Sequence, residues 1–156
     1  VPEPLIPKQG ARIMSLSDPS KKMSKSDDSD KGCIYLLDKP EVARKKVMSA
    51  VTDSLGIIQY NPVEQPGVSN LLTIHSALSG ISIPDLVKSF EGQGYGNLKK
   101  AVASEVENLL ISLQARYQEL VSEDVLTQVL ESGKTNATPI AHQTLIDVQT
   151  KVGIEI

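Results

Sequence analysis

Apolar residues recur every three or four positions through most of the chain after Pro40, and this spacing is typical of amphipathic α-helices that bury one face. The most regular stretch covers residues 98–121, where the recurring apolar positions are Leu98, Val102, Val106, Leu109, Leu113, Tyr117 and Leu120. We therefore expect one long helix over these residues.

Four further helices are predicted from the same spacing and from residues that start or stop helices. The first begins after Pro40, and the second runs to Gly80. A third, over residues 83–90, has Pro84 in its first turn, where proline is tolerated. The last extends from about Asp124 to Val152 and is expected to bend between residues 133 and 139, because Pro139 removes a helix hydrogen bond. The predicted apolar faces of the first two are Val42, Ala43, Val47, Met48 and Val51, and Val68, Leu71, Leu72, Ile74 and Leu78.

The first forty residues follow a different pattern. Three prolines among the first seven residues exclude a helix there. "ARIMSL", residues 11–16, is a short apolar run whose length and flanks favour a strand, and "CIYLLD", residues 33–38, is a second extended run. We therefore expect a mainly α fold, a bundle of about five helices preceded by a short strand and a loop.

Composition and charge exclude several classes of protein. The chain has 156 residues, a net charge of −3 and a single cysteine, Cys33. A disulfide framework is excluded, and a reducing, cytoplasmic location is expected. No apolar run approaches the roughly 20 residues of a membrane span, and the N-terminal residues do not resemble a signal peptide. Any contact with nucleic acid must come from local basic patches.

Several short motifs have more ordinary explanations than the chemistry they suggest. "GQGYG", residues 92–96, follows a helix where a phosphate loop needs a strand, and "GKT", residues 133–135, lacks the glycine that begins a Walker A motif. His75 and His142 have no partners at metal-ligand spacing, so packing or surface roles are expected. Cys33, in an apolar run, is expected to be a small core residue.

The lysine-rich segment "KKMSKSDD", residues 21–28, has a more specific context. Composition alone favours a solvated turn. However, "GARIMSLSDPSKKMSKSDD" resembles the second signature of class I aminoacyl-tRNA synthetases in its tryptophanyl-tRNA synthetase form, and residues 22–26 match all five letters of Lys-Met-Ser-Lys-Ser. The same resemblance extends to "AVTDS" at 50–54, "PGVSNLL" at 66–72 and "YGNLKKAV" at 95–102.

The resemblance implies a division of the chain into three parts. Residues 1–26 would be the C-terminal edge of the catalytic domain with the signature loop, residues 27–38 a connector, and residues 39–156 a helical anticodon-binding domain. The family's first signature and its Rossmann domain, which holds the amino-acid pocket, are not recognisable here. By this resemblance the chain is the C-terminal part of the enzyme and should be inactive alone.

The resemblance also implies roles for individual residues. Lys22 and Lys25 would be catalytic, stabilising charge on pyrophosphate as it leaves ATP, because positioned cations lower such a barrier. No residue is assigned to a metal; ATP and Mg²⁺ would act in the intact enzyme, and this fragment is not expected to bind either tightly. The expected ATP-binding residues are Ile13, Lys22, Met23, Ser24, Lys25 and Ser26.

The implied partners are tRNA(Trp), ATP and, through the other domain, tryptophan, with a homodimer in the intact enzyme and no membrane. Exposed basic residues on the helices would meet tRNA phosphates, although solvated surface charge explains each of them equally well. The candidates are Lys45, Lys46, Lys99, Lys100 and Arg116. A stand-alone helical RNA-binding module or a protein-interaction module remains an alternative.

Overall fold

The structure is a computed structural model that describes residues 2–7, 10–26, 29–122 and 124–154. It divides into two compact units, Val1–Gln114 and Ala115–Ile156, which are considered separately. Asp27 and Asp28, where the expected connector begins, lie outside the described residues.

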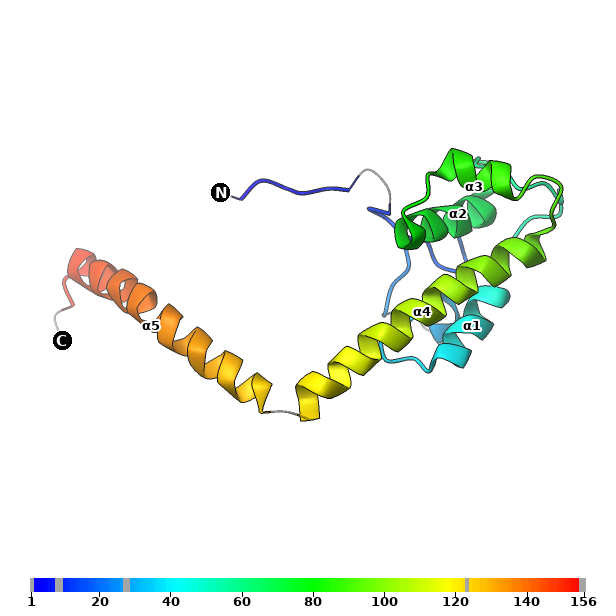
Figure 1. Ribbon diagram of the computed structural model, residues 1–156. Helices are drawn as coiled ribbons and strands as arrows, with labels where there is room; N and C mark the ends of the chain where they lie inside the picture. The colour runs from blue at the N-terminus through cyan, green and yellow to red at the C-terminus, as the bar shows by residue number, and fades with distance from the viewer. Residues whose placement is uncertain (1, 8–9, 27–28, 123, 155–156) are drawn as a thin grey trace. The chain divides into compact units, whose positions relative to one another are not determined.

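The described residues form five α-helices, as predicted, together with one short 3₁₀ turn (Figure 1). The elements in chain order are η1 (Asp30–Gly32), α1 (Pro40–Met48), α2 (Pro66–Ser79), α3 (Ile83–Ser89), α4 (Tyr95–Ser122) and α5 (Val125–Val152). α1, α2 and α3 each have proline in the first turn, and Gly80 ends α2 in the left-handed conformation that glycine adopts readily. The mainly α prediction is confirmed.

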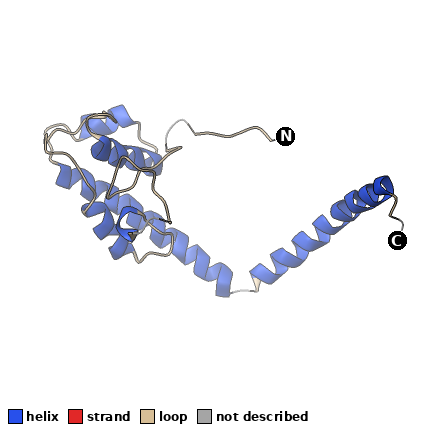
Figure 2. Cartoon of the chain, turned by 180° about the vertical axis from the view of Figure 1, so that it is seen from behind, coloured by secondary structure: helices blue, strands red, loops and turns tan. Residues whose placement is uncertain are grey.

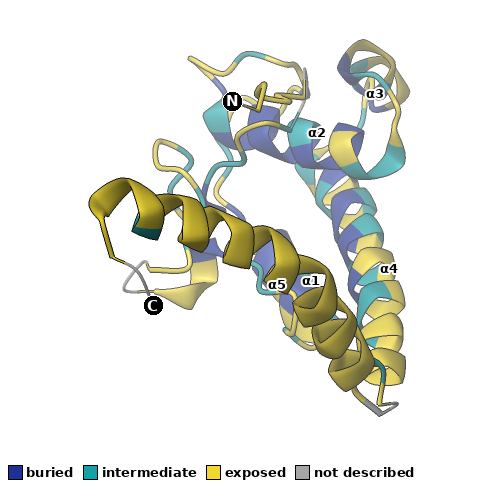
Figure 3. Ribbon diagram, turned by 90° about the vertical axis from the view of Figure 1, so that its left-hand side faces the viewer, coloured by how far each residue is buried: buried dark blue, intermediate teal, exposed yellow. Residues whose placement is uncertain are grey.

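The first unit has a hydrophobic core to which α1, α2, α3 and the N-terminal part of α4 all contribute, with α3 packed against α2 (Figures 1 and 3). Its helical members are Ala43 and Val47 of α1, Val68, Leu71, Leu72 and Ile74 of α2, Leu86 of α3, and Leu98, Val102, Ala103, Val106 and Leu110 of α4. Burial of this apolar surface is the main term that holds the unit together.

The predicted faces of α1 and α4 need correction. Leu110 of α4 is buried, whereas the predicted Leu109 is 41% exposed. Leu98, Val102, Val106 and Leu110 therefore form the inner row at steps of four. Val42 of α1 is also exposed, and Val51 lies beyond the end of α1 at Met48, so α1 buries a narrower stripe than expected.

The two runs expected to be extended do not form strands in the described part of the chain (Figure 2). Within residues 11–16 only Met14 makes a β-bridge, to Lys22. Residues 33–38 include a turn in which the Asp38 amide donates to the Tyr35 carbonyl. A strand needs a neighbouring edge along its length, and the described residues provide one at Met14 alone.

The segment before the lysine loop is nevertheless fixed to the helical core. Leu16 is only 2% exposed; its amide donates to the Gly32 carbonyl at 3.0 Å, and its carbonyl accepts from the Val51 amide at 2.8 Å. These two bonds attach the segment to η1 and to the loop after α1.

The second unit contains the end of α4 and α5. α5 continues as one helix through Gly133 and Pro139, and it has no buried residue among those described (Figure 3). Its apolar side chains, such as Leu130 and Ile140, are exposed. No helix in the described ranges combines the length and the apolarity needed to cross a membrane.

Gly67, in the first turn of α2, lies against the loop that follows α1. A Cβ atom placed on Gly67 would be 2.1 Å from the Val51 carbonyl oxygen. Only a residue without a side chain permits this approach, and Val51 is the residue whose amide binds Leu16.

We expect Gly67→Ala to destabilise the chain by about 1–3 kcal/mol or more, because backbone must shift to admit the methyl group. Urea unfolding of the two chains measures the difference. Gly96→Ala is the matched control, since a Cβ there meets nothing within 4 Å. In a helix it should be neutral or stabilising by up to about 1 kcal/mol. Equal stability of Gly67→Ala and Gly96→Ala would contradict the close-contact explanation.

Candidate functional site

The lysine loop begins as the second arm of a short hairpin. Met14 and Lys22 are antiparallel bridge partners, and the two flanking backbone bonds run from Ser15 to Lys21 (2.9 Å) and from Met23 to Ile13 (3.0 Å). The hairpin therefore places Ile13, one of the expected ATP-binding residues, beside Lys22 and Met23 of the five-residue signature.

Asp18 organises the turn of the hairpin. Its carboxylate accepts bonds from the Ser20 hydroxyl at 2.6 Å and the Ser20 amide at 3.2 Å, and it pairs with the Lys21 ammonium at 3.1 Å. Hydrogen bonds from the Ser20 side chain and from Lys21 lower the pKa of Asp18. Lys21 is thus paired with Asp18.

Lys22 and Lys25 are exposed, and neither pairs with a carboxylate of the described residues. Met23 is half-buried and packs against the core, which anchors the signature at its second position. The Ser24 hydroxyl accepts from the Ser26 amide at 3.2 Å and so shapes the turn between the lysines. The side chains of Lys22 and Lys25 are thus exposed on either side of this turn.

Asn70, a buried residue of α2, binds the opposite side of the hairpin. Its Oδ1 accepts from the Met14 amide at 2.8 Å, and its Nδ2 donates to the Met14 carbonyl at 2.8 Å. The side-chain amide therefore satisfies both backbone groups of the residue that pairs with Lys22.

A second polar cluster joins Asp53 and Tyr95, which lie in two of the segments that carry the family resemblance, to Gln65, which directly precedes the third segment. Gln65 Nε2 donates to Asp53 at 3.0 Å, to the Ile57 carbonyl at 2.9 Å and to the Tyr95 hydroxyl at 3.0 Å, and Tyr95 donates to Asp53. Partial burial opposes ionisation of Asp53, but the bonds from Tyr95, the Leu55 amide and Gln65 outweigh it and lower the pKa of Asp53. Burial and the bond to Asp53 raise the pKa of Tyr95.

Two of the five basic residues considered for tRNA contact have structural roles instead. Lys46 is only 8% exposed; its Nζ donates to the Cys33 carbonyl at 2.9 Å and the Asp38 carboxylate at 2.8 Å. Lys99 donates to the Ala50 carbonyl at 2.7 Å, and burial lowers its pKa. Lys45, Lys100 and Arg116 are exposed, as the hypothesis requires.

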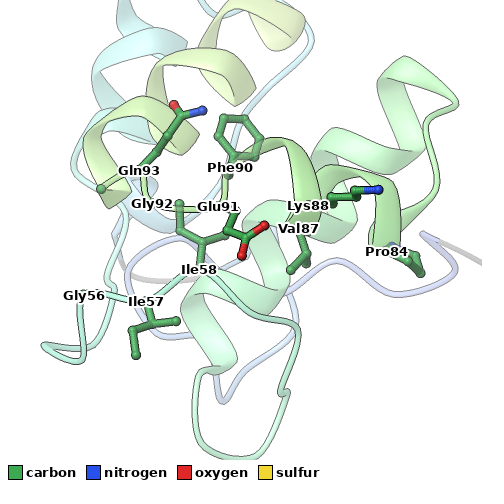
Figure 4. A pocket seen from close by; sticks show the side chains of 11 residues that line it. Gly56, Ile57, Ile58, Pro84, Val87, Lys88, Phe90, Glu91, Gly92 and Gln93 are labelled. Carbon is green, nitrogen blue, oxygen red and sulfur yellow. The ribbon is translucent and has the colours of Figure 1, made fainter.

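A pocket of about 590 Å³ lies away from the signature residues (Figure 4). Its walls come from Gly56–Ile58 and from α3 with the turn that follows it, including Lys88, Phe90 and Glu91. None of the residues expected to bind ATP lines it.

The family model described as tRNA synthetases class I (W and Y) matches residues 1–111. The chain belongs to this family. A tryptophan–tRNA ligase from Enterococcus faecalis is 49% identical over 154 residues, covering 99% of this chain and 46% of the relative. One from Bacillus subtilis is 47% identical, covering 99% of this chain and 47% of the relative.

The solved tryptophanyl-tRNA synthetase from Mycoplasma pneumoniae is also similar, with a TM-score of 0.81 and 37% identity, covering 96% of this chain and 45% of that chain. The chain therefore spans about half the length of the synthetases it matches. The resemblance to the tryptophanyl form, drawn from the lysine signature and its flanks, is confirmed.

The structure shows where several of the other short motifs lie. "GQGYG" spans the turn between α3 and α4 and the start of α4, and "GKT" lies inside α5. His75 is buried beside the Phe90 ring, and Cys33 is buried. In the part of the chain that is described, no three His, Cys, Asp or Glu side chains are grouped as metal ligands.

Sequence reasoning did not single out Asn70, Asp53 or Gln65. The available signal for Asn70 was a polar residue inside the apolar stripe of "VSNLL", which implies a buried partner. The identity of that partner, 56 residues away, was not readable from the pattern.

The lowered pKa of Asp53 predicts a specific pH dependence. A carboxyl whose pKa is lower in the folded chain than its ordinary value of 3.8 stabilises the fold above that pH, and this contribution is lost as the pH falls through the folded-state pKa. Asp53→Asn should therefore lower the free energy of unfolding at pH 7, by about 1–3 kcal/mol for lost charged hydrogen bonds. It should also weaken the loss of stability on acidification.

Denaturant unfolding from pH 7 to pH 3 tests this for the unmodified chain, Asp53→Asn and Tyr95→Phe. Tyr95→Phe keeps the carboxylate but removes one donor, so its pH dependence should be intermediate. If the unmodified chain and Asp53→Asn lost stability equally on acidification, Asp53 would not be the group responsible.

Proposed function

We propose that this chain is part of a tryptophan–tRNA ligase, which activates tryptophan with ATP and transfers it to tRNA(Trp). Membership of the class I family and the similarity to tryptophan–tRNA ligases support the proposal. The observation that carries it furthest is the hairpin that pairs Ile13 and Met14 with Lys22 and Met23, because it assembles the expected nucleotide-binding residues in one place.

In the proposed activation step, a carboxylate oxygen of tryptophan attacks the α-phosphorus of ATP. The bond from that phosphorus to the bridging oxygen breaks, so that tryptophanyl-adenylate forms and pyrophosphate leaves. Negative charge accumulates on the leaving pyrophosphate, and Lys22 and Lys25 are the catalytic residues that stabilise it. Lysine suits this position because its ammonium is a compact charge on a flexible stem.

The other expected ATP-binding residues would bind the nucleotide without reacting. We assign the backbone at Ile13 to the adenine, Ser24 and Ser26 to phosphate oxygens or to the shape of the turn, and Met23 to the anchoring of the loop. Mg²⁺ would share the phosphate charge in the intact enzyme, and we assign none of the described residues to it.

For the rest of the chain we propose the division expected from the sequence. Residues 1–26 belong to the catalytic domain, 27–38 connect the domains, and 39–156 read the anticodon. Lys45, Lys100 and Arg116 are the exposed candidates for contact with tRNA phosphates. The intact enzyme is proposed to be a cytoplasmic homodimer, and residues 1–156 alone are proposed to be inactive because other residues form the tryptophan pocket.

A protein-interaction module is the second candidate, and one observation favours it. α5 exposes apolar side chains along its length, including Leu126, Val129 and Leu130, more than a solvated helix requires. The isolated module would not need Lys22 or Lys25, so the variants below separate the two functions.

We expect Lys22→Ala and Lys25→Ala each to slow adenylate formation in the full-length synthetase by roughly a hundredfold or more, since each removes a cationic contact to developing charge. Tryptophan binding should change little, because the effect belongs to the transition state. Single-turnover formation of tryptophanyl-adenylate measures the rate, and tryptophan affinity is determined separately.

Lys21→Ala is the matched control in this series. Lys21 is adjacent in sequence but pairs with Asp18, so its loss should have the small effect of a surface charge. If Lys21→Ala were the most damaging of the three, or if all three acted mainly on tryptophan binding, the assignment of Lys22 and Lys25 would be wrong.

A further inference from the structure

We infer that Asn70 is a positioning residue for adenylate formation, which holds the lysine hairpin in its working geometry from α2. The inference rests on the proposed function of the lysine loop. It adds a residue that contacts neither ATP nor tryptophan and acts through the backbone of Met14.

The pattern of the hairpin leaves Met14 dependent on Asn70. Since the two backbone bonds of the hairpin run between the residues flanking Met14 and Lys22, these two form a non-hydrogen-bonded pair. In such a pair the amide and carbonyl of each residue point away from the other arm. Asn70 meets both outward groups of Met14, at 2.8 Å each, in the place of a third strand.

Few side chains can replace Asn70 in this role. The position needs one donor and one acceptor separated as they are in a peptide group, and a carboxamide provides both. Asn70 is 5% exposed, and the next two residues of α2, Leu71 and Leu72, are fully buried in the core. The amide is therefore held by a packed helix, which fixes the position of Met14 relative to the helical core.

The position of Met14 in turn constrains that of the catalytic Lys22. Lys22 lies directly across the hairpin from Met14 as its bridge partner. A displacement of about 1 Å in a catalytic group can slow a reaction on the order of a hundredfold. Loss of the Asn70 amide should thus reduce the rate without removing any group that touches the substrate.

A hollow of about 240 Å³ borders both Met14 and Asn70. After Asn70→Ala, water can enter from this side and bond to the freed backbone groups of Met14, which limits the loss of stability. Water does not restore the fixed geometry. The rate should therefore fall more than the stability, which distinguishes positioning from general support of the fold.

The test uses the full-length synthetase with Asn70→Ala and Asn70→Asp. Asn70→Asp keeps the size and the acceptor but sets an oxygen against the Met14 carbonyl, so it remains informative if the alanine variant folds poorly. We expect both to slow single-turnover adenylate formation on the order of 10- to 100-fold, with tryptophan affinity changed less than about twofold.

Gln65→Ala is the matched control. Gln65 is a buried carboxamide at the start of α2 with several hydrogen bonds, but none of them involves the hairpin. It should lower the thermal unfolding temperature at least as much as Asn70→Ala while leaving the rate of adenylate formation within about twofold of the unmodified enzyme. Equal rate losses in the two variants would overturn the inference.

A double-mutant cycle with Lys22→Ala tests whether Asn70 acts through the lysine. If Asn70 positions Lys22, adding Asn70→Ala to Lys22→Ala should slow the reaction less than about twofold further. A further loss as large as that in the unmodified background would overturn the inference while leaving the proposed function intact. If Lys22→Ala alone had no effect, the proposed function would fail, and this inference with it.

Discussion

The pair of hydrogen bonds between Asn70 and the backbone of Met14 is the interaction on which the arrangement of the lysine loop depends. An isolated two-stranded hairpin is marginally stable in water, and this one has a single bridge pair. Asn70 gives the arm that contains Met14 a partner on a packed helix. Two residues after Met14, Leu16 is buried in the core and forms backbone hydrogen bonds with Gly32 and Val51. A segment too short to be a strand is thereby fixed on both sides.

Parts of the chain that lie far apart in sequence are linked by a series of close contacts. Met14 is bound by the side chain of Asn70, while Leu16 accepts from Val51, the residue that Gly67 approaches closely. Around that contact, Asp53, Gln65 and Tyr95 share hydrogen bonds. The helical core thus supports an exposed segment in which neither Lys22 nor Lys25 pairs with a carboxylate of the described residues, and loops held by a packed scaffold are where proteins often place functional residues.

Periodicity predicted α1 to α4 well because each of these helices contributes buried apolar residues to the core, and Gly80 and the first-turn prolines mark ends of α1, α2 and α3. It could not choose between Leu109 and Leu110, since both fit steps of three and four and only the neighbouring helices decide. The charge of Lys46 suggested an exposed side chain, but Lys46 is buried. Its hydrogen-bond partners, Cys33 and Asp38, lie in the run of residues 33–38 that the sequence pattern predicted to be extended. The signature residues were readable as a motif, whereas the pairing of Ile13 with Met23 and the bond to Asn70 depend on contacts distant in sequence.

Hydrogen exchange of the Met14 amide measures the central claim most directly. In the 156-residue chain this amide donates to a side chain held by α2, so it should exchange as slowly as the amides of the core part of α2 and far more slowly than that of exposed Lys25. In Asn70→Ala it should exchange at least about tenfold faster, while the amide of Val102, a buried residue of α4, stays protected. Exchange of Met14 as fast as Lys25 in the unmodified chain would contradict the account.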